Sequence, residues 1–181
     1  GSPLFTENAY GRRVLLRKGD LVYMTSEGGS PEGNMPFLST FNTKTKEQQI
    51  LWRSQAPYYE RVSKVLTADA SSFITIKEGI ETQPNYWLRT TKKRMAPKQI
   101  TAFADPYPSL KGIQKQLVTY PRKDGLNLSA ILYTPAGYSP EKDGSLPVLM
   151  WAYPREYKSA ADAAQVRGSK YTFTRLSWGS P

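Results

Sequence analysis

The stretch Pro147-Val148-Leu149-Met150-Trp151-Ala152-Tyr153 is a nearly continuous apolar run. A β-strand that is apolar on both faces belongs inside a sheet covered on both sides, as in α/β folds, because each face must be hidden from water. We therefore expect residues 147–153 to form an interior strand with paired neighbours. A solvent-facing course for these residues would contradict that expectation.

A β-hairpin is predicted immediately before this run. Residues 115–120 and 126–134 read as strands on either side of the turn Arg122-Lys123-Asp124-Gly125. Asp-Gly between two β runs is a strong hairpin signal. A period of two, which is typical of a half-buried strand, places four residues of the second strand on one face: Leu126, Leu128, Ala130 and Leu132.

The first half of the chain alternates short β runs with turns. The predicted strands are 14–16, 21–25, 36–42, 49–53, 72–78, 85–90 and 99–103. Gly and Pro interrupt residues 27–34, which we expect to be a loop. A turn signal about every 8–12 residues favours an all-β sandwich, barrel or propeller. The strand series 21–53 and 73–103 are each close to the size of a propeller repeat.

Composition shifts at Asp105-Pro106-Tyr107-Pro108. Each proline fixes its own φ and restricts the residue before it, so this segment is predicted to be an extended linker. We place a domain boundary here, with residues 1–106 as one unit and 107–181 as a second, incomplete one. Within the second unit, Ser159-Ala160-Ala161-Asp162 resembles a capping box, which predicts a short helix over residues 160–166.

The chain contains neither cysteine nor histidine. Without cysteine it has no disulfide, no thiolate metal site and no cysteine nucleophile. Histidine is the usual general base at neutral pH, so a Ser-His-Asp triad cannot be built from this chain alone. The sequence also lacks a Gly-x-Ser-x-Gly nucleophile elbow, a Walker-type loop and calcium-loop spacing. We expect no cofactor and no metal.

The net charge of +10 leaves two interpretations open. One is a basic, β-rich binding module for an anionic partner. The other, which we favour, is a chain whose acidic complement lies elsewhere, because the basic residues are dispersed. Their one tight cluster, Lys92-Lys93-Arg94, is placed at a hairpin tip. We therefore expect no nucleic-acid partner.

No membrane or targeting segment is evident. No apolar run approaches the ~20 residues of a membrane span, so no membrane partner is expected. The first residues lack the basic region and the apolar core of a signal peptide. The sequence does not fix the compartment; a bacterial parent with a signal peptide would place the protein in the periplasm or outside the cell.

Several segments resemble the prolyl oligopeptidase family of serine peptidases, in its glutamyl endopeptidase branch. Those that look like the entry into the catalytic domain are 107–116 (YPSLKGIQKQ), 120–125 (YPRKDG) and 132–138 (LYTPAGY). Those that narrow the resemblance to the branch are 146–157 (LPVLMWAYPREY) and 165–169 (QVRGS). Residues 8–11 and 29–33 are similar to its last propeller blades. The resemblance implies a mainly β chain: the end of a β-propeller in residues 1–106, followed by the first strands of an incomplete α/β-hydrolase sheet.

The resemblance also implies a function. The parent would be a serine endopeptidase that cleaves after acidic residues, with a peptide as substrate. The catalytic Ser, Asp and His would lie beyond this chain, so the chain alone is expected to be inactive. It would bind the remaining part of the peptidase domain, or self-associate through exposed strand edges.

One catalytic residue can be carried over by resemblance. Tyr153 matches a tyrosine whose hydroxyl helps to bind the oxyanion in relatives, a role that suits a preorganised donor. The alternatives are that Tyr153 is an ordinary residue at a strand end or that Tyr157 has the role. Arg155 is a candidate for pairing with an acidic substrate side chain, because a guanidinium binds a carboxylate bidentately; alternatively, it is a loop residue paired with Glu156.

Overall fold

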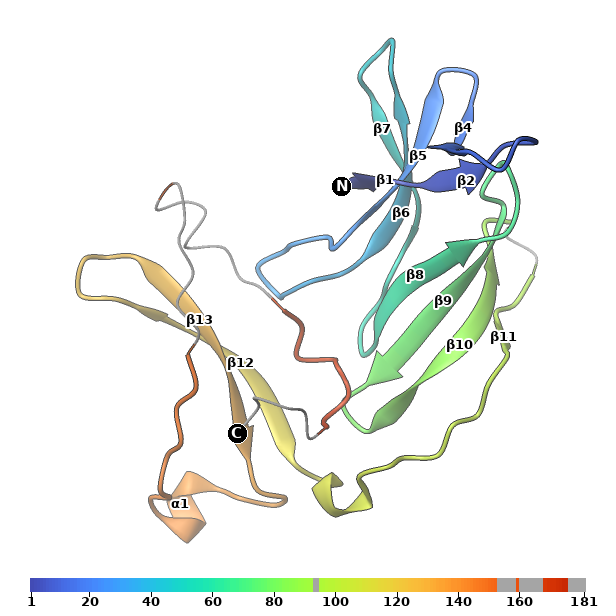
Figure 1. Ribbon diagram of the computed structural model, residues 1–181. Coiled ribbons are helices and arrows are strands. Elements are labelled where there is room, and N and C mark those ends of the chain that lie inside the picture. The colour runs from blue at the N-terminus through green and yellow to red at the C-terminus, as the bar shows by residue number, and fades with distance from the viewer. Residues whose placement is uncertain (93–94, 153–158, 160–167, 176–181) are drawn as a thin grey trace.

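The computed structural model describes residues 1–92, 95–152, 159 and 168–175. Within these residues the protein consists mainly of antiparallel strands in several sheets, none of which closes on itself (Figure 1). The only helices in this part of the chain are a 3-10 turn, η1 (Pro108–Leu110), and a single α-helical turn, α1 (Pro140–Asp143). The prediction of a mainly β chain is confirmed.

The first sheet has the strand order β1-β5-β6-β7, with β4 also paired to β5. A separate two-stranded ribbon, β2 with β3, lies beside it (Figure 1). The loop at residues 27–34 separates β5 from β6, as predicted. The bounds are β1 Ser2–Pro3, β2 Phe5–Glu7, β3 Arg13–Leu15, β4 Arg17–Lys18, β5 Leu21–Ser26, β6 Phe37–Asn42 and β7 Gln48–Arg53.

The second sheet has the order β11-β10-β9-β8. Its strands are β8 (Tyr59–Val65), β9 (Ser72–Gly79), β10 (Thr82–Thr90) and β11 (Lys98–Gln99). Strand β8 was missed by the sequence analysis, and β11 is shorter than the predicted 99–103. The Asn85 side chain explains the early end, because its Oδ1 accepts Thr101 Oγ1 at 2.9 Å and the Phe103 N–H at 2.7 Å in place of a strand ladder.

The hydrophobic core lies where the two sheets pack together. Its buried members are Leu16, Tyr23, Leu38, Ala70 and Phe73. The Trp52 ring of β7 meets the Phe73 ring of β9 edge-on, with centroids 5.7 Å apart. These contacts join the first sheet to the second and fix the orientation of the outer face of the second sheet.

The hairpin of β12 (Gln114–Pro121) and β13 (Asn127–Thr134) forms as predicted, paired from Gln114 opposite Thr134 to Pro121 opposite Asn127. Its predicted half-buried face forms only in part: Leu126 and Leu128 are half-buried, whereas Ala130 and Leu132 are exposed. Among the described residues no third strand pairs with the hairpin, which stands apart from the two sheets in Figure 1. A two-stranded ribbon buries a side chain only where another segment covers it, as residues 168–175 cover Lys115 of β12.

The prediction of an interior strand at residues 147–153 is wrong for the described part, 147–152. These residues form no strand, and Val148, Leu149 and Met150 are 82%, 77% and 82% exposed. A strand that is apolar on both faces needs two paired neighbours and two covering layers. No described segment supplies either, so the apolar run lies in solvent. The predicted helix at 160–166 lies outside the described residues.

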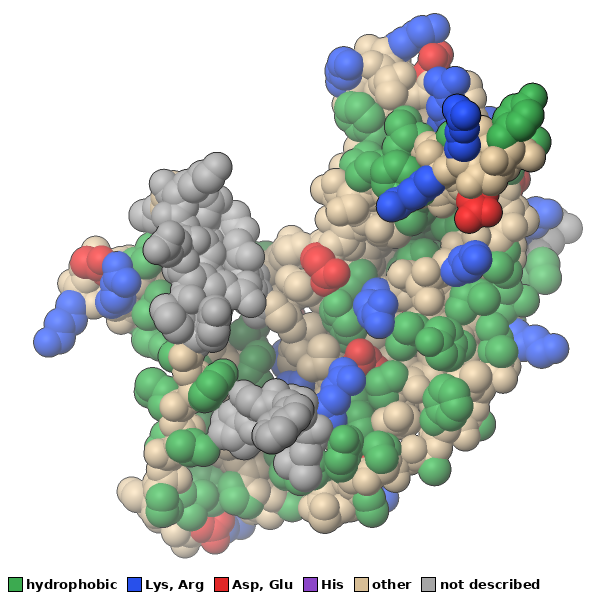
Figure 2. All heavy atoms as spheres, viewed as in Figure 1, with side chains coloured by type: hydrophobic (Ala, Val, Ile, Leu, Met, Phe, Trp, Pro, Cys, Tyr) green, Lys and Arg blue, Asp and Glu red, His purple; other side chains and the backbone are tan. Residues whose placement is uncertain are grey.

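The molecule is open rather than compact. Its accessible surface is 13039 Å², whereas a compact monomer of 20.4 kDa exposes roughly 8,800 Å². In Figure 2 the part that carries the hairpin stands off from the body that carries the two sheets. Lys and Arg side chains are scattered over the face shown rather than gathered in one patch. Of the helices in the described residues, none has the length and apolar character to cross a membrane.

Candidate functional site: a pocket on the outer face of the second sheet

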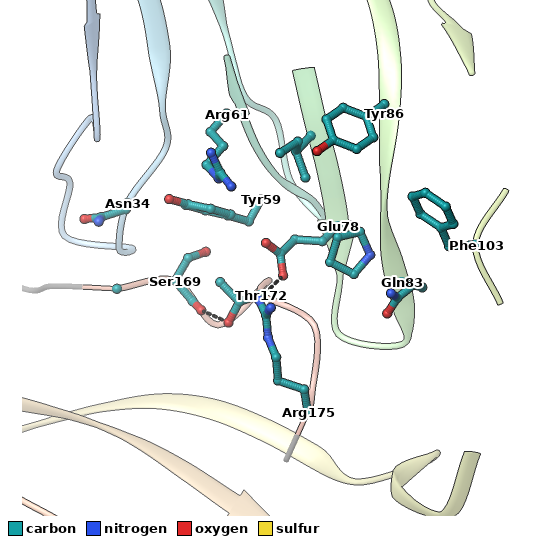
Figure 3. A pocket seen from close by; sticks show the side chains of 13 residues that line it. Asn34, Tyr59, Arg61, Glu78, Gln83, Tyr86, Phe103, Ser169, Thr172 and Arg175 are labelled. Carbon is teal, nitrogen blue, oxygen red and sulfur yellow. Dashed lines mark hydrogen bonds and ion pairs between the residues drawn. The ribbon is translucent and has the colours of Figure 1, made fainter. Parts of the chain in front are cut away.

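A pocket of about 520 Å³ lies on the outer face of the second sheet (Figure 3). Strands β8, β9 and β10 supply one wall, and residues 168–175 supply the opposite wall. A volume of this size is typical of sites for small ligands and peptide side chains. The side chains of interest in its lining are Asn34, Tyr59, Arg61, Glu78, Tyr86, Phe103, Ser169 and Arg175.

Strand alternation explains which side chains face the pocket. Arg61 of β8 lies opposite Ile76 of β9, which lies opposite Tyr86 of β10. Residues directly opposite one another in a sheet share a face. Successive residues point to opposite faces, so Glu60, the neighbour of Arg61, points toward the core and is buried. The pleat thus puts the Arg61 cation and the Tyr86 ring on the same face of the sheet, with Ile76 between them.

The segment 168–175 is held against this face by backbone hydrogen bonds. The Asn34 N–H donates to the carbonyl of Gly168 at 2.7 Å, and the Thr174 N–H donates to the carbonyl of Ile80 at 3.0 Å. Gly33 has φ +103°, and a Cβ there would come within 2.8 Å of the Gly168 carbonyl oxygen. Only glycine fits this close approach without strain. Segment 168–175 therefore bridges the β5–β6 loop and the β9–β10 turn.

Lys115 ties the β12–β13 hairpin to the same segment. Its Nζ donates to the carbonyl oxygen of Thr172 at 2.9 Å and to Thr172 Oγ1 at 2.5 Å. Burial lowers the pKa of Lys115 to about 8, because the charged ammonium is poorly solvated there, although nearby Glu78 opposes the shift. A second tether is the Gly112 N–H, which donates to Glu81 Oε1 at 2.7 Å. Lys115 thus joins the hairpin to the pocket wall formed by residues 168–175. Gly112 joins the segment before the hairpin to the β9–β10 turn.

Both carboxylates beside the pocket already have partners. Glu78 Oε2 accepts the Phe173 N–H at 2.8 Å and Arg175 Nη2 at 3.1 Å. Glu27 Oε2 accepts the Tyr59 hydroxyl at 2.8 Å and the Asn34 amide at 3.3 Å. Burial, followed by the bond to Glu27, raises the pKa of Tyr59, so its phenol stays neutral at physiological pH.

The site residues predicted from sequence are not placed by the structure. Tyr153, Arg155 and the alternative Tyr157 lie outside the described residues. The pocket residues themselves were not predicted, because they come from segments more than a hundred positions apart and no local motif links them. The alternation of side chains along a strand at 59–65 could have shown that Arg61 and Glu60 point to opposite faces. It could not have shown which residues surround Arg61. Within the described part of the chain, no group of three or more acidic residues is placed to hold a metal ion.

Comparison with known proteins finds close relatives by sequence. The chain is 37% identical over its whole length to a probable chloroplastic glutamyl endopeptidase of Oryza sativa subsp. japonica, covering 21% of that protein. It is 39% identical over 97% of its length to a probable chloroplastic glutamyl endopeptidase of Arabidopsis thaliana, covering 20% of it. The chain therefore spans about a fifth of the length of these curated relatives.

Two further comparisons add little. No family model matches the chain. Among solved structures, a variant of the AtxE2 isopeptidase aligns with 76% of this chain and 22% of its own, at 11% identity and a TM-score of 0.43. That score is too low to support an argument about fold.

Proposed function

We propose, from the premise that this chain belongs with the glutamyl endopeptidases in sequence, that it is a segment of a serine endopeptidase that cleaves peptides after acidic residues. The observation that carries the proposal is the identity of 37–39% along essentially the whole chain to two probable glutamyl endopeptidases. A chain without histidine cannot supply the general base of the usual triad. The 181-residue chain is therefore inactive by itself and contributes to a site completed by other residues of the peptidase domain.

In this proposal residues 1–106 are the last blades of a β-propeller and residues 107–181 begin an α/β-hydrolase domain. Two features of the described residues support the division. The two larger sheets share one core, whereas the β12–β13 hairpin stands apart and connects to them through residues 100–113 and segment 168–175. The accessible surface is also larger than that of a compact monomer of this mass, as expected for a chain that normally packs against further parts of the protein.

The chemical role of this chain is transition-state binding. Tyr153 donates its hydroxyl to the oxyanion that develops during peptide hydrolysis, and Arg155 pairs with the acidic side chain of the substrate. A donor held against charge that appears only in the transition state contributes to kcat, and removing one such donor costs roughly 10²–10³-fold in kcat. A residue that binds only the substrate side chain contributes mainly to KM.

A chimera tests the proposal. The segment of the rice relative that aligns with this chain is replaced by the 181 residues, and cleavage of fluorogenic peptides with Glu or Gln before the scissile bond is measured. We expect the chimera to cleave the Glu peptide faster than the Gln peptide, and the isolated 181-residue chain to cleave neither.

Two substitutions in the chimera separate the tyrosine roles. Tyr153→Phe should lower kcat with little change in KM, whereas Tyr157→Phe should leave both near the parent values. Equal effects of the two substitutions, or a kcat loss only in Tyr157→Phe, would reassign the oxyanion donor. Turnover by the isolated chain above background would refute the proposal that the catalytic centre lies outside it.

A further inference from the structure

One cation in the pocket has no anionic partner among the described residues. The ion pairs of the described chain are Lys44 with Asp20, Arg89 with Glu60, Arg122 with Asp124 and Arg175 with Glu78. Arg61, which lines the pocket, is in none of them. In Figure 3 the Arg61 guanidinium lies over the pocket beside Tyr59, with Glu78 and Arg175 on the far side.

The two carboxylates beside the pocket are bonded to groups other than Arg61. Glu78 is buried, and its Oε2 is fixed by the Phe173 N–H and by Arg175. Glu27 is engaged by the Tyr59 hydroxyl and by Asn34. The charged side chains in the pocket lining are Arg61, Arg175 and Glu78, so the lining itself has one positive charge in excess. Glu27 lies outside the lining and accepts hydrogen bonds from Tyr59 and Asn34. Since Arg175 makes a single contact to Glu78 and its side chain is 48% exposed, it also keeps donors free.

The rest of the lining suits a peptide rather than a bare inorganic anion. The rings of Tyr86 and Phe103, 38% and 54% exposed, line the pocket together with Ile76 and Pro84. Exposed aromatic rings beside a polar anchor are typical of surfaces that bind peptides. The exposed Gly168 on the opposite wall adds backbone that an extended peptide could contact.

We propose that this pocket binds a carboxylate of a peptide, with Arg61 as the bidentate anchor and Arg175 as a secondary donor. A guanidinium presents its N–H groups in a planar fork that matches a carboxylate. The peptide class rests on the proposed function, and the anchor proposed here is Arg61 of β8 rather than Arg155. The carboxylate comes either from an acidic side chain or from a peptide C-terminus.

Peptide binding to the 181-residue chain tests this inference without requiring catalysis. Three fluorescently labelled peptides of the same length are compared by anisotropy: one with an internal Glu and an amidated end, one with Gln in its place and an amidated end, and one with Gln and a free C-terminus. Hydrogen bonds to charged groups are worth about 1.5–3 kcal/mol. Arg61→Gln should therefore weaken binding of the carboxylate-bearing peptide about 10–150-fold.

Lys64→Gln is the matched control. Lys64 lies on the same strand as Arg61. On the neighbouring strand β9, Arg61 pairs with Ile76 and Lys64 pairs with Ile74. Because Ile74 and Ile76 are two residues apart, both cations are on the same face of the sheet. Lys64 does not line the pocket, and its replacement removes the same charge. Affinity should change less than twofold in this variant, and circular dichroism should show that both variants keep the parent strand signal.

Each outcome decides the inference. Stronger binding of the internal Glu peptide assigns an acidic side chain as the ligand, and stronger binding of the free C-terminus assigns the terminal carboxylate. Equal binding of all three peptides overturns the inference. Equal losses in the Arg61 and Lys64 variants also overturn it, because they indicate general attraction to a basic chain. These results are independent of hydrolysis by the chimera, so binding can fail while the peptidase proposal holds, or the reverse.

Discussion

Replacing Arg89 with methionine tests how much stability depends on an ion pair buried beside the core. Arg89 donates Nε to Glu60 Oε1 at 2.8 Å and Nη2 to Oε2 at 2.6 Å, and Thr75 Oγ1 adds a third bond of 2.5 Å. The two charged side chains are only 19% and 4% exposed. The pair is therefore shielded from water and from salt.

The expected cost follows from what the substitution leaves behind. Methionine keeps most of the apolar stem and removes the guanidinium, whose Cζ lies 5.9 Å from the centroid of the Trp52 ring. The main loss is a buried Glu60 carboxylate that keeps Thr75 as a hydrogen-bond donor and Lys77 as a nearby cation. Removing one partner of a buried ion pair costs about 3–5 kcal/mol. With a urea dependence of about 2 kcal/mol per molar, the unfolding midpoint should fall by about 1.5–2.5 M. Urea titration followed by tryptophan fluorescence measures this shift.

The chain contains a control with the same fork geometry in solvent. Arg122 donates Nε to Asp124 Oδ1 at 2.9 Å and Nη2 to Oδ2 at 2.5 Å, but these side chains are 55% and 56% exposed. Exposed pairs gain little because water and salt screen them, so Arg122→Met should leave the midpoint unchanged within error.

The double variant Glu60→Leu with Arg89→Met completes the test. Replacing both partners of a buried pair by apolar groups is often neutral or stabilising, so the double variant should recover most of the loss. The reasoning would be refuted if Arg89→Met and Arg122→Met shifted the midpoint equally, or if the double variant were no more stable than Arg89→Met alone.

Three further predictions concern other parts of the chain. Gly28→Ala should destabilise the protein more than Gly125→Ala, because both positions have positive φ but only a Cβ at Gly28 would overlap backbone, at Met35; urea midpoints of the two variants measure the difference. Lys115 has a pKa of about 8 in the folded chain and a reference value of 10.5. Between these pH values the unfolded chain binds more protons than the folded chain, so the free energy of unfolding should rise with pH. Lys115→Met should abolish that rise in thermal unfolding measured from pH 7.5 to 10. The exposed run at 148–151 should make the chain self-associate; light scattering should show a mass above 20.4 kDa that falls toward the monomer in Leu149→Ser with Trp151→Ser, and a monomeric parent chain would contradict this.

The sequence was informative wherever local chemistry decides structure. The β12–β13 turn follows from Asp124-Gly125, since Gly125 adopts φ +85° and such a residue between β runs is a hairpin signal. The loop at 27–34 was predicted from its glycines and proline, and one of these glycines, Gly33, lets it approach segment 168–175. These predictions needed no knowledge of distant parts of the chain.

The sequence failed where a distant partner decides structure. Strand β8 reads as polar, because its buried residue is Glu60, and that burial is tolerable only through Arg89, which lies 29 residues away. The pocket depends on a still longer separation, since Phe173 and Arg175 reach Glu78 across 95 and 97 positions. Period-two patterning detects strands by their apolar faces. It therefore does not detect a strand whose buried side chain is a charged residue held in an ion pair.

The exposed run 147–152 shows what such a pattern does establish. Its composition specifies an environment, namely paired neighbours and cover on both faces, and a strand forms only where that environment exists. In the described chain it does not exist, and Val148 and Met150 are each 82% exposed. Apolar surface of this kind is unfavourable in water, so a surface that supplies strand pairing and apolar cover should bury it. The failed prediction of an interior strand and the expectation of self-association therefore have the same physical cause.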